Sequence, residues 1–481
     1  MSAELLLSID LGTTRLKVAA FGPDGRLLAL VTRRHREYRD ASRSWQSAEE
    51  WWDDTVELVR RALADPQVAG RRLLGLSLCG RGGAAVFVDD GGTVIEQPWS
   101  DGRHRDELRR VFEWRSDGVR IPSYAAALVA KALWLRERAP ERFRRVRHAL
   151  YAKDFLLYRL TGVTMTDWSS GPDAPEWDER LFARSKLEPS LVPTPALPWE
   201  LAGTLTRRAA EELGCPARTP VAVGAHDGIC ANVGAAAGLP GAYAITLGTH
   251  AVVRAITCRV PEGAFRFYGL PPDRHVIGGN ALLAGRALEW LLDHWFDSSS
   301  DGRAEPFARL DAEAARVAPG ADGVRFLPFL GGQVAPHRRP DATAAFAGLR
   351  LEHGRPQLWR AALEGTAFAI RDIFQQVRAW CGLPRVIRLT GGGERSEAWT
   401  QILADVLDER LESTGPAAES RGAAVFLAVA LGLHADVDDA ARAMTRVANV
   451  REPDPERAAV YAEIGRAWEE LAEATRSPDP G

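Results

Sequence analysis

The segment Ser8-Ile9-Asp10-Leu11-Gly12-Thr13-Thr14 stands near the start of the chain. A similar segment, Ala244-Ile245-Thr246-Leu247-Gly248-Thr249-His250, follows at about the midpoint of the 481 residues. Each lies between two apolar runs, a pattern that predicts a strand, a tight turn and a second strand. The shared tripeptide Leu-Gly-Thr is weak evidence on its own, but its recurrence between two apolar runs predicts two similarly built lobes. We expect the boundary near residues 238–241, with domains at 1–239 and 240–475 and a flexible Pro-rich tail at 476–481.

The remaining pattern of the first half predicts alternating strands and helices. Strands are expected at 5–10, 15–21, 26–32, 73–78 and 84–88, and helices at 48–64 (with Ser47 as N-cap), 124–137 and 140–148. This alternation favours an α/β fold with a sheet of mixed strand directions.

The composition is that of a globular protein and excludes several classes of partner. Hydrophobic residues make up 46% of the chain and the formal net charge is −3, so no strong field attracts nucleic acid or an anionic membrane. The five cysteines are scattered and form no CxxC pair, which argues against a disulfide framework or a zinc site. Because no basic leader or apolar run of about 20 residues is present, we expect a cytoplasmic protein.

The first turn has the composition of an anion-binding loop. A glycine lets backbone N–H groups approach an anion closely, and the hydroxyls of Thr13 and Thr14 add donors. The carboxylate of Asp10, at the end of the strand, is a candidate to face a phosphate-bound Mg²⁺. The segment does not match the GxxxxGK[ST] phosphate loop. A plain hairpin turn explains the same residues equally well.

A second motif is Gly224-Ala225-His226-Asp227-Gly228, which follows an apolar strand and opens a helix of small residues. An acid at the carboxyl end of a strand stands where α/β proteins place reactive groups. The alternative is that Asp227 only caps the helix.

A third motif is Leu389-Thr390-Gly391-Gly392-Gly393, in which a strand ends in three glycines before a helix that starts near Ser396. Without a Cβ, such a loop can lie flat beneath a nucleoside. It does not match the GxGxxG fingerprint, and an ordinary strand–helix turn is the alternative.

Taken in order, these motifs resemble those of the FGGY carbohydrate kinases, members of the actin-like ATPase superfamily. The resemblance extends from about residue 5 to residue 432, and further blocks that match are 99–103, 131–135, 153–162, 326–332, 360–368 and 401–406. A chaperone-like ATPase of the same superfamily would need a further peptide-binding domain, for which the chain after residue 432 is too short.

The resemblance implies two ribonuclease-H-like domains with a cleft between them, and ATP and Mg²⁺ as cofactors. It implies that Asp227 is the general base. It also implies that Asp10 and Asp227 meet across the cleft and form the metal site. The phosphate- and nucleoside-binding residues become Gly12, Thr13, Thr14, Gly248, Thr249, Gly391, Gly392, Gly393, Ser396 and Gln401. Family members are often dimers, so a homodimer is expected, although no segment identifies an interface.

The acceptor pocket is where the sequence departs from the family. The resemblance implies acceptor contacts from Arg81, Trp99, Asp101, Arg103 and Asp227. The block that contains Trp99, Asp101 and Arg103 is most similar to that of xylulose kinases. The Gln-Met-His block of those enzymes is absent, and Gly82 stands where glycerol kinases carry glutamate. We expect a pentulose such as xylulose as the acceptor. The alternatives are glycerol or a tetritol, a noncatalytic nucleotide-binding member of the fold and, for Arg81 alone, a structural ion pair.

Overall fold

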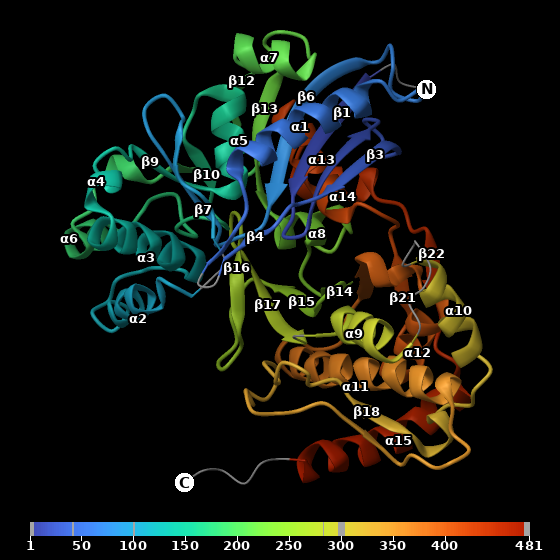
Figure 1. Ribbon diagram of the computed structural model, residues 1–481. Coiled ribbons are helices and arrows are strands. Elements are labelled where there is room, and N and C mark those ends of the chain that lie inside the picture. The colour runs from blue at the N-terminus through green and yellow to red at the C-terminus, as the bar shows by residue number, and fades with distance from the viewer. Residues whose placement is uncertain (1–3, 41–42, 100–101, 282, 297–303, 476–481) are drawn as a thin grey trace. The chain divides into compact units, whose positions relative to one another are not determined.

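The computed structural model describes residues 4–40, 43–99, 102–281, 283–296 and 304–475. The chain divides into two compact units (Figure 1). The first unit contains Met1–Ala236, Tyr268–Asp273 and Ala417–Thr445, and the second contains Ala237–Phe267, Arg274–Pro416 and Arg446–Gly481. The sequence predicts one crossing between domains, near residue 239. In the structure, residues 417–445 of the expected C-terminal domain pack with the first unit. The expected tail, 476–481, lies outside the described residues.

The first unit is built on a six-stranded sheet of mixed direction. Its order is β12 (Leu201–Thr204), β13 (Pro220–His226), β6 (Arg72–Gly80), β1 (Glu4–Leu11), β2 (Arg15–Phe21) and β3 (Leu27–Arg34). Strands β13, β6 and β1 are parallel to one another, whereas the hairpins β1–β2 and β2–β3 and the edge strand β12 are antiparallel. The central strand β1 is buried along almost its whole length, which requires cover on both faces of the sheet.

Helices supply that cover (Figure 1). One face packs its alternate residues Leu5, Leu7 and Ile9 against α1 (Ala48–Leu63), α5 (Ala152–Thr161) and α7 (Arg207–Leu213). The other face contacts α13 (Ala418–Ala430), which also packs on α8 (Asp227–Gly234) and α14 (Val437–Met444). The sheet therefore depends on a helix encoded almost 200 residues after its last strand.

A smaller layer completes the first unit. It has the sheet β8 (Val94–Glu96), β7 (Ala85–Val88) and β9 (His148–Tyr151), covered by α2 (Arg105–Glu113) and α3 (Ser123–Arg138), and includes the short helices α4 (Pro140–Phe143) and α6 (Glu179–Ser185). The short strand pair β10 (Met165–Asp167) and β11 (Thr194–Ala196) packs instead on the core of the six-stranded sheet.

The second unit is built on a seven-stranded sheet. Its order is β16 (Arg266–Leu270), β17 (Arg274–Ala281), β15 (Ala251–Thr257), β14 (Ala242–Leu247), β20 (Val386–Thr390), β21 (Leu411–Ser413) and β22 (Asn449–Arg451). Its core joins this sheet to α9 (Gly285–Trp295), α10 (Ala304–Ala314), α11 (Arg355–Cys381), α12 (Glu397–Leu407) and α15 (Pro455–Ala474). A small hairpin of β18 (Arg325–Leu327) and β19 (Ala345–Ala347) packs on α11.

Most predicted elements of the first half are present within two residues of their expected ends, and Ser47 caps α1 by accepting a hydrogen bond from Glu50 N. The helix predicted at 140–148 is wrong. Helix α4 ends at Phe143, and His148 already begins strand β9. The apolar residues after His148 pair with β7, so long-range strand pairing overrides the local helical pattern.

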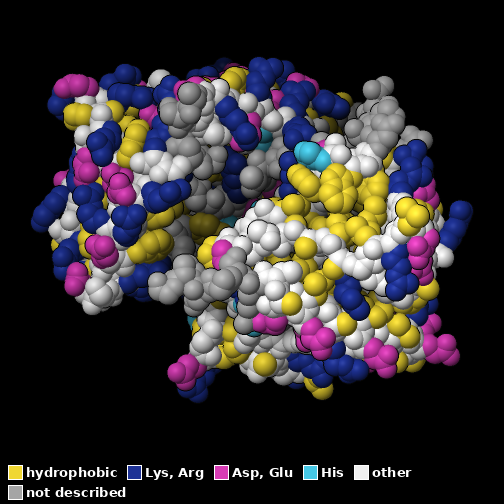
Figure 2. Space-filling model, turned by 60° about the horizontal axis from the view of Figure 1, so that its bottom comes forward, with side chains coloured by type: hydrophobic (Ala, Val, Ile, Leu, Met, Phe, Trp, Pro, Cys, Tyr) yellow, Lys and Arg dark blue, Asp and Glu magenta, His cyan; other side chains and the backbone are white. Residues whose placement is uncertain are grey.

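The surface carries both signs of charge. On the face seen in Figure 2, acidic and basic side chains are interspersed around an area of hydrophobic side chains. Within the described residues, no helix is both long and apolar enough to cross a membrane.

Candidate active site

Three predicted site residues meet at one edge of the sheet of the first unit. Asp10 lies near the end of β1, Arg81 directly follows β6, and Asp227 directly follows β13. Register places Asp10 beside Cys79, and Cys79 beside Ala225, so the three strands end at the same level. Because the carboxyl ends of parallel strands share one edge, residues distant in sequence come together there. The sequence analysis expects Asp10 and Asp227 to meet across a cleft; both belong to the first unit, Asp10 in strand β1 and Asp227 directly after strand β13.

Asp10 is a buried carboxylate with a cationic partner. It is 1% exposed, and its Oδ2 lies 2.8 Å from the Nζ of Lys17, which is also 3.3 Å from Oε2 of Glu419 on α13. Burial raises the pKa of Asp10, against the opposing attraction of Lys17. Burial alone would lower the pKa of Lys17, but Asp10 and Glu419 raise it overall, so Lys17 stays charged. Sequence reasoning missed Lys17, although it is the direct cross-strand neighbour of Asp10 in the β1–β2 hairpin.

The donor set at this edge suits a hydrated cation rather than a closed metal site. No group of three or more His, Cys, Asp or Glu side chains able to hold a metal occurs in the part of the chain that the structure describes. Asp10 is already neutralised by Lys17. Mg²⁺ keeps several waters and binds through one or two carboxylates together with substrate phosphates, so Asp10 and Asp227 fit that ion.

The β1–β2 turn presents its side chains to solvent. Thr13 and Thr14 are exposed. Their carbonyl oxygens accept hydrogen bonds from the interior: Thr14 O from the backbone N of His35 at 2.9 Å, and Thr13 O from Nε2 of Gln46 at 3.3 Å. The ring of His35 also lies 3.1 Å from Gly12 O. With its carbonyls fixed in this way, the turn leaves two hydroxyls accessible as donors.

Arg81 is a partly buried cation without a carboxylate partner among the described residues. Its Nη2 donates to Oε1 of Gln46 at 3.1 Å, its Nη1 donates to Thr13 O at 3.3 Å, and its guanidinium lies over the ring of Trp51 at 5.2 Å. Burial lowers the pKa of Arg81 to about 10, and the nearby charge of Asp227 raises it in part. The structural ion pair considered as an alternative for Arg81 is therefore not found in the described chain.

Two other predicted acceptor residues belong to the smaller layer. Trp99 is 3% exposed and packs in the core of that layer, with the guanidinium of Arg103 stacked over it at 4.9 Å. Its carbonyl accepts a hydrogen bond from Nζ of Lys131 at 3.0 Å, and the same ammonium donates to Gly83 O at 2.9 Å, which ties Trp99 to the loop after Arg81. Asp101 lies outside the described residues.

Asp227 is the first residue of α8, not its cap. His226 is the N-cap: its Nδ1 accepts from Gly228 N at 3.0 Å and lies 3.2 Å from Oδ1 of Asp227. The alternative role of Asp227 as a helix cap is therefore wrong. Its side chain is 31% exposed, so the carboxylate is accessible to a substrate.

A buried charge cluster lies beneath this strand end and was missed at the sequence level. Lys153 is 1% exposed, with its Nζ 2.5 Å from Oδ1 of Asp154 and 3.0 Å from Oδ1 of Asp167. Asp167 also accepts a hydrogen bond from the hydroxyl of Ser169. The Oγ of Ser169 in turn accepts a hydrogen bond from the backbone N of His226 at 3.4 Å. Burial raises the pKa of Asp154 to about 6. Burial also opposes ionisation of Asp167, but Lys153 and Ser169 outweigh it and lower its pKa.

In the second unit, the predicted phosphate hairpin lies at the start of a helix. Gly248 and Thr249 form the β14–β15 turn, and their carbonyls accept from the backbone N–H groups of Gly285 and Arg286 on α9, each at 3.0 Å. Thr249 is exposed.

The glycine loop lies beside this hairpin because β14 and β20 are parallel neighbours. Gly391 has φ +91°, and a Cβ there would lie 2.5 Å from the carbonyl oxygen of Leu247. A glycine is therefore required for the loop to pass the hairpin. The structure brings together Gly248, Thr249, Gly391, Gly392 and Gly393 within one unit.

Ser396 and Gln401 are engaged in local structure. The Oγ of Ser396 caps α12 by accepting from Trp399 N at 3.0 Å, and it donates to Oδ2 of Asp311 at 2.6 Å. The amide of Gln401 donates to Oδ1 of Asp405 and to the carbonyl of Glu452, each at 2.9 Å. Both polar groups thus already have partners within the second unit.

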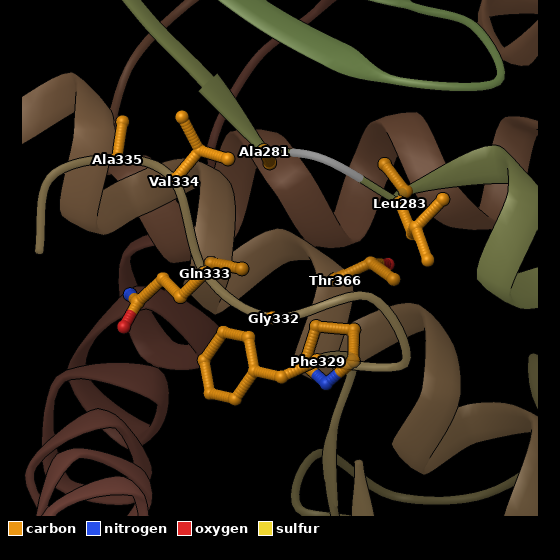
Figure 3. Close-up of a pocket in the computed structure, with 11 residues that line it drawn as sticks. Ala281, Leu283, Phe329, Gly332, Gln333, Val334, Ala335 and Thr366 are labelled. Atoms are coloured by element: carbon orange, nitrogen blue, oxygen red, sulfur yellow. The ribbon is translucent and has the colours of Figure 1, made fainter. Parts of the chain in front are cut away.

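A mostly apolar pocket also opens in the second unit (Figure 3). It is lined by Ala281 at the end of β17, Leu283 and Ala284 before α9, residues of the 328–335 loop, and Thr366 and Ala369 of α11.

Comparisons with known proteins identify the family of the chain. Models of the FGGY family of carbohydrate kinases match residues 5–234 with the N-terminal domain and residues 243–431 with the C-terminal domain. The chain is 26% identical to a xylulose kinase of Staphylococcus epidermidis (99% of this chain, 98% of the relative). It is 30% identical to that of Escherichia coli (85% and 86%) and 27% identical to a gluconokinase of Bacillus subtilis (89% and 87%).

Solved structures show the same fold. A ligand-bound xylulose kinase from Lactobacillus acidophilus matches with a TM-score of 0.83 at 21% identity (98% of each chain). A glycerol kinase from Plasmodium falciparum with ADP matches with a TM-score of 0.83 at 18% identity (99% of each chain). With both halves of the chain matched in order, the protein belongs to the FGGY family of carbohydrate kinases.

Proposed function

We propose that this kinase transfers the γ-phosphoryl group of ATP to a hydroxyl of a small sugar or polyol, with a pentulose such as xylulose as the first candidate. The observation that carries the proposal is the convergence of Asp10, Arg81 and Asp227 at the ends of three adjacent parallel strands. This edge offers an accessible carboxylate, a neutralised buried carboxylate and a guanidinium within one unit.

Asp227 acts as the general base in this proposal. It accepts the proton of the attacking hydroxyl, whose oxygen forms the new bond to the γ-phosphorus while the bond to the leaving ADP oxygen breaks. Such a base contributes about 10²–10⁴-fold to the rate. When bound, Mg²⁺ neutralises charge on the phosphates. Asp10 would hold this ion through water, with Asp227 nearby.

Backbone and hydroxyl donors supply the remaining binding groups. In the first unit, Gly12, Thr13 and Thr14 bind phosphate oxygens; in the second unit, Gly248 and Thr249 do so, and Gly391–Gly393 flank the adenosine. The two turns that carry these donors are closed by their own hydrogen bonds, from Gly12 N to Arg15 O at 3.1 Å and from Gly248 N to His250 O at 3.0 Å, so the turns need little reorganisation during the reaction. Ser396 and Gln401, on the helix after the glycine loop, lie near the adenosine in this proposal, and their polar groups also have partners within α12 and its neighbours.

On the acceptor side, Arg81 donates to hydroxyls, and the family resemblance assigns further acceptor contacts to Trp99, Asp101 and Arg103. Xylulose is supported by the relatives named as xylulose kinases. Gluconate is a second candidate, because Arg81 has no carboxylate partner in the described chain and a gluconokinase is among the relatives. An anionic acceptor would supply that missing partner.

The test is acceptor-stimulated release of ADP from the purified protein with ATP and Mg²⁺. The panel is xylulose, gluconate, glycerol and erythritol. We expect one acceptor to stimulate release, and Asp227→Asn to reduce kcat at least 100-fold while ATP binding, measured by calorimetry, is retained. Failure of every acceptor would favour a noncatalytic nucleotide-binding protein, and normal turnover of the variant would exclude Asp227 as the base.

On the basis of the family resemblance we also expect a homodimer and a cytoplasmic location. Light scattering and cell fractionation test these two points.

A further inference from the structure

Gln46 lies directly before the N-cap of α1, and hydrogen bonds fix both its backbone and its side chain. Its backbone N donates to Pro98 O at 3.1 Å, and its Oε1 accepts from Nε1 of Trp51 at 3.1 Å. Relative to the N-cap Ser47, Gln46 and Trp51 occupy the N′ and N4 positions, whose side chains meet across the first turn of a helix. The start of α1 therefore sets where the amide of Gln46 lies.

The amide of Gln46 closes a ring of hydrogen bonds between two parts of the proposed site. Its Oε1 accepts from Nη2 of Arg81 at 3.1 Å, and its Nε2 donates to Thr13 O at 3.3 Å. Nη1 of Arg81 donates to the same carbonyl oxygen at 3.3 Å. The guanidinium on the acceptor side and the turn that is assigned to phosphate are thus joined through one side chain.

Gln46 orients Arg81 without neutralising its charge. Within the described chain, the guanidinium contacts an amide oxygen, a backbone carbonyl and the ring face of Trp51 at 5.2 Å, all of which are uncharged. Its Nε is buried and has no hydrogen-bond partner among the described residues. A carboxylate at position 46 would also hold the guanidinium, but it would compensate the charge that a phosphate or an acceptor hydroxyl attracts.

The start of α1 is held without the contacts of Gln46 to Arg81 and Thr13. Ser47 supplies the cap by accepting from Glu50 N at 3.2 Å. Trp51 is 1% exposed and packs in the core of the first unit. Gln46 itself is only half-buried. The two contacts across the site therefore exceed what the local structure of the helix requires.

We propose that Gln46 is a positioning residue of the kinase reaction. It holds the guanidinium of Arg81 and the Gly12–Thr14 turn in a fixed mutual orientation and leaves the charge of Arg81 for the substrates. The inference rests on the proposed function, in which Arg81 binds the acceptor and the turn binds phosphate. Gln46 then aligns one substrate with the other without touching either, and small errors in such alignment lower the rate of transfer.

A double-mutant cycle on acceptor-stimulated release of ADP tests this role. Gln46→Met keeps the length of the side chain but removes the amide, so it should raise the acceptor KM and lower kcat, each about tenfold. Arg81→Ala should also raise the acceptor KM. Adding Gln46→Met to Arg81→Ala should raise that KM by less than about twofold further, because residues that act through one contact are not additive.

Two further variants separate charge from geometry. Gln46→Glu keeps an oxygen beside Arg81 but places a negative charge next to the phosphate turn, so it should raise the KM of ATP about tenfold as well as that of the acceptor. Gln46→Asn keeps a neutral amide that is one CH₂ group too short to close the ring, so it should reproduce the effects of Gln46→Met.

The matched control is Gln67, an exposed glutamine of the first unit outside the site. Gln67→Met and Gln67→Glu should leave kcat and both KM values unchanged. Thermal unfolding of each variant shows whether it is folded at the assay temperature, and the midpoints for Gln46→Asn and Gln46→Met should lie within a few degrees of the wild-type value.

An additive rise of the acceptor KM in the double variant would overturn the positioning role, since general damage to the fold would act independently of Arg81. Unchanged kinetics in Gln46→Met and Gln46→Glu would overturn it too. Both results would leave the kinase activity established. Absence of any acceptor-stimulated release of ADP from the wild-type protein would overturn the proposed function and this inference together.

Discussion

Three of the four lysines of this arginine-rich chain lie against oxygen atoms inside the first unit. Lys17 contacts Asp10, Lys131 donates to two backbone carbonyls, and Lys153 contacts Asp154 and Asp167. An ammonium is a compact point charge with three donors, which suits a small buried cage of oxygen atoms better than the planar guanidinium does.

Lys153→Met should destabilise the protein strongly. Removing the ammonium leaves two buried carboxylates facing each other, and breaking a buried ion pair costs about 3–5 kcal/mol. Urea unfolding followed by tryptophan fluorescence measures the change. Lys186→Met, at an exposed position, is the control and should cost less than about 1 kcal/mol. Equal stability of the two variants would show that the cluster is not held by Lys153.

Asp372→Asn should alter the pH dependence of stability. Burial raises the pKa of Asp372 on α11 to about 7, although Arg371 partly opposes this rise. Between about pH 4 and 7 the folded state therefore holds a proton that the unfolded state has lost, and this contribution to stability disappears as the pH rises through 7. The variant removes the group, so its free energy of unfolding relative to wild type should rise from pH 5 to pH 8, by at most about 1.4 kcal/mol per pH unit.

Urea unfolding at pH 5, 6.5 and 8 checks this dependence. Asp106→Asn, whose side chain is 82% exposed, is the control and should show no such trend. A difference for Asp372→Asn that stays constant with pH would contradict the raised pKa.

At the scale of elements, helix α8, which begins with Asp227, packs closely against helix α13 at two glycines. A Cβ on Gly422 of α13 would lie 2.0 Å from the carbonyl oxygen of Cys230 on α8, and one on Gly234 of α8 would lie 1.9 Å from that of Ala418. The two helices thus touch backbone to backbone. Their separation fixes the position of the first turn of α8 and hence of Asp227.

Gly422→Ala should therefore destabilise the protein and lower kcat. In an ordinary helix interior this change stabilises by about 1 kcal/mol. Here the methyl group meets backbone that cannot rotate away, and overpacking of this kind costs about 1–3 kcal/mol. Thermal unfolding and acceptor-stimulated turnover measure the two effects. Gly91→Ala is the matched control, because a Cβ at Gly91 would meet only Asp89 Oδ1 at 3.5 Å and Thr93 Oγ1 at 4.0 Å. A gain in stability for Gly422→Ala would contradict the close contact.

At the scale of the whole molecule, the first unit is not contiguous in sequence. Helix α13 contacts β1, β2, β6 and β13, although it follows most of the second unit along the chain. The sheet of the first unit therefore acquires one of its covering layers only when residues 417–445 are present.

A fragment that ends at residue 239 should consequently fail to fold cooperatively. It would expose the apolar face of four strands that α13 covers, and burial of such surface contributes roughly 25 cal/mol per Å². We expect dye binding to exposed apolar surface and no sharp thermal transition, with recovery when a peptide of residues 412–446 is added. A cooperative transition close to that of the full chain would contradict this dependence.

Features that depend on neighbours in sequence could be predicted from the sequence. The Leu-Gly-Thr segments form hairpins, and Ser47 caps α1, because turn conformation and capping involve residues only a few positions apart. The prediction at 140–148 was wrong because strand pairing with β7 is not local. Lys17 and Lys153 were missed for the same reason, since their partners are defined by register and burial and not by a motif.

The sequence by itself determined the strand–turn–strand segments, the helix starts and, through the order of its motifs, the family. Only the tertiary structure decided that Asp10, Arg81 and Asp227 share one sheet edge, that Gln46 joins Arg81 to the turn at Thr13, and that residues 417–445 return to the first unit. The physical reason is the distance along the chain over which each interaction acts. Periodicity and turn geometry act over a few residues, whereas the choice of neighbouring strands and packed side chains follows from burying apolar surface across the whole chain.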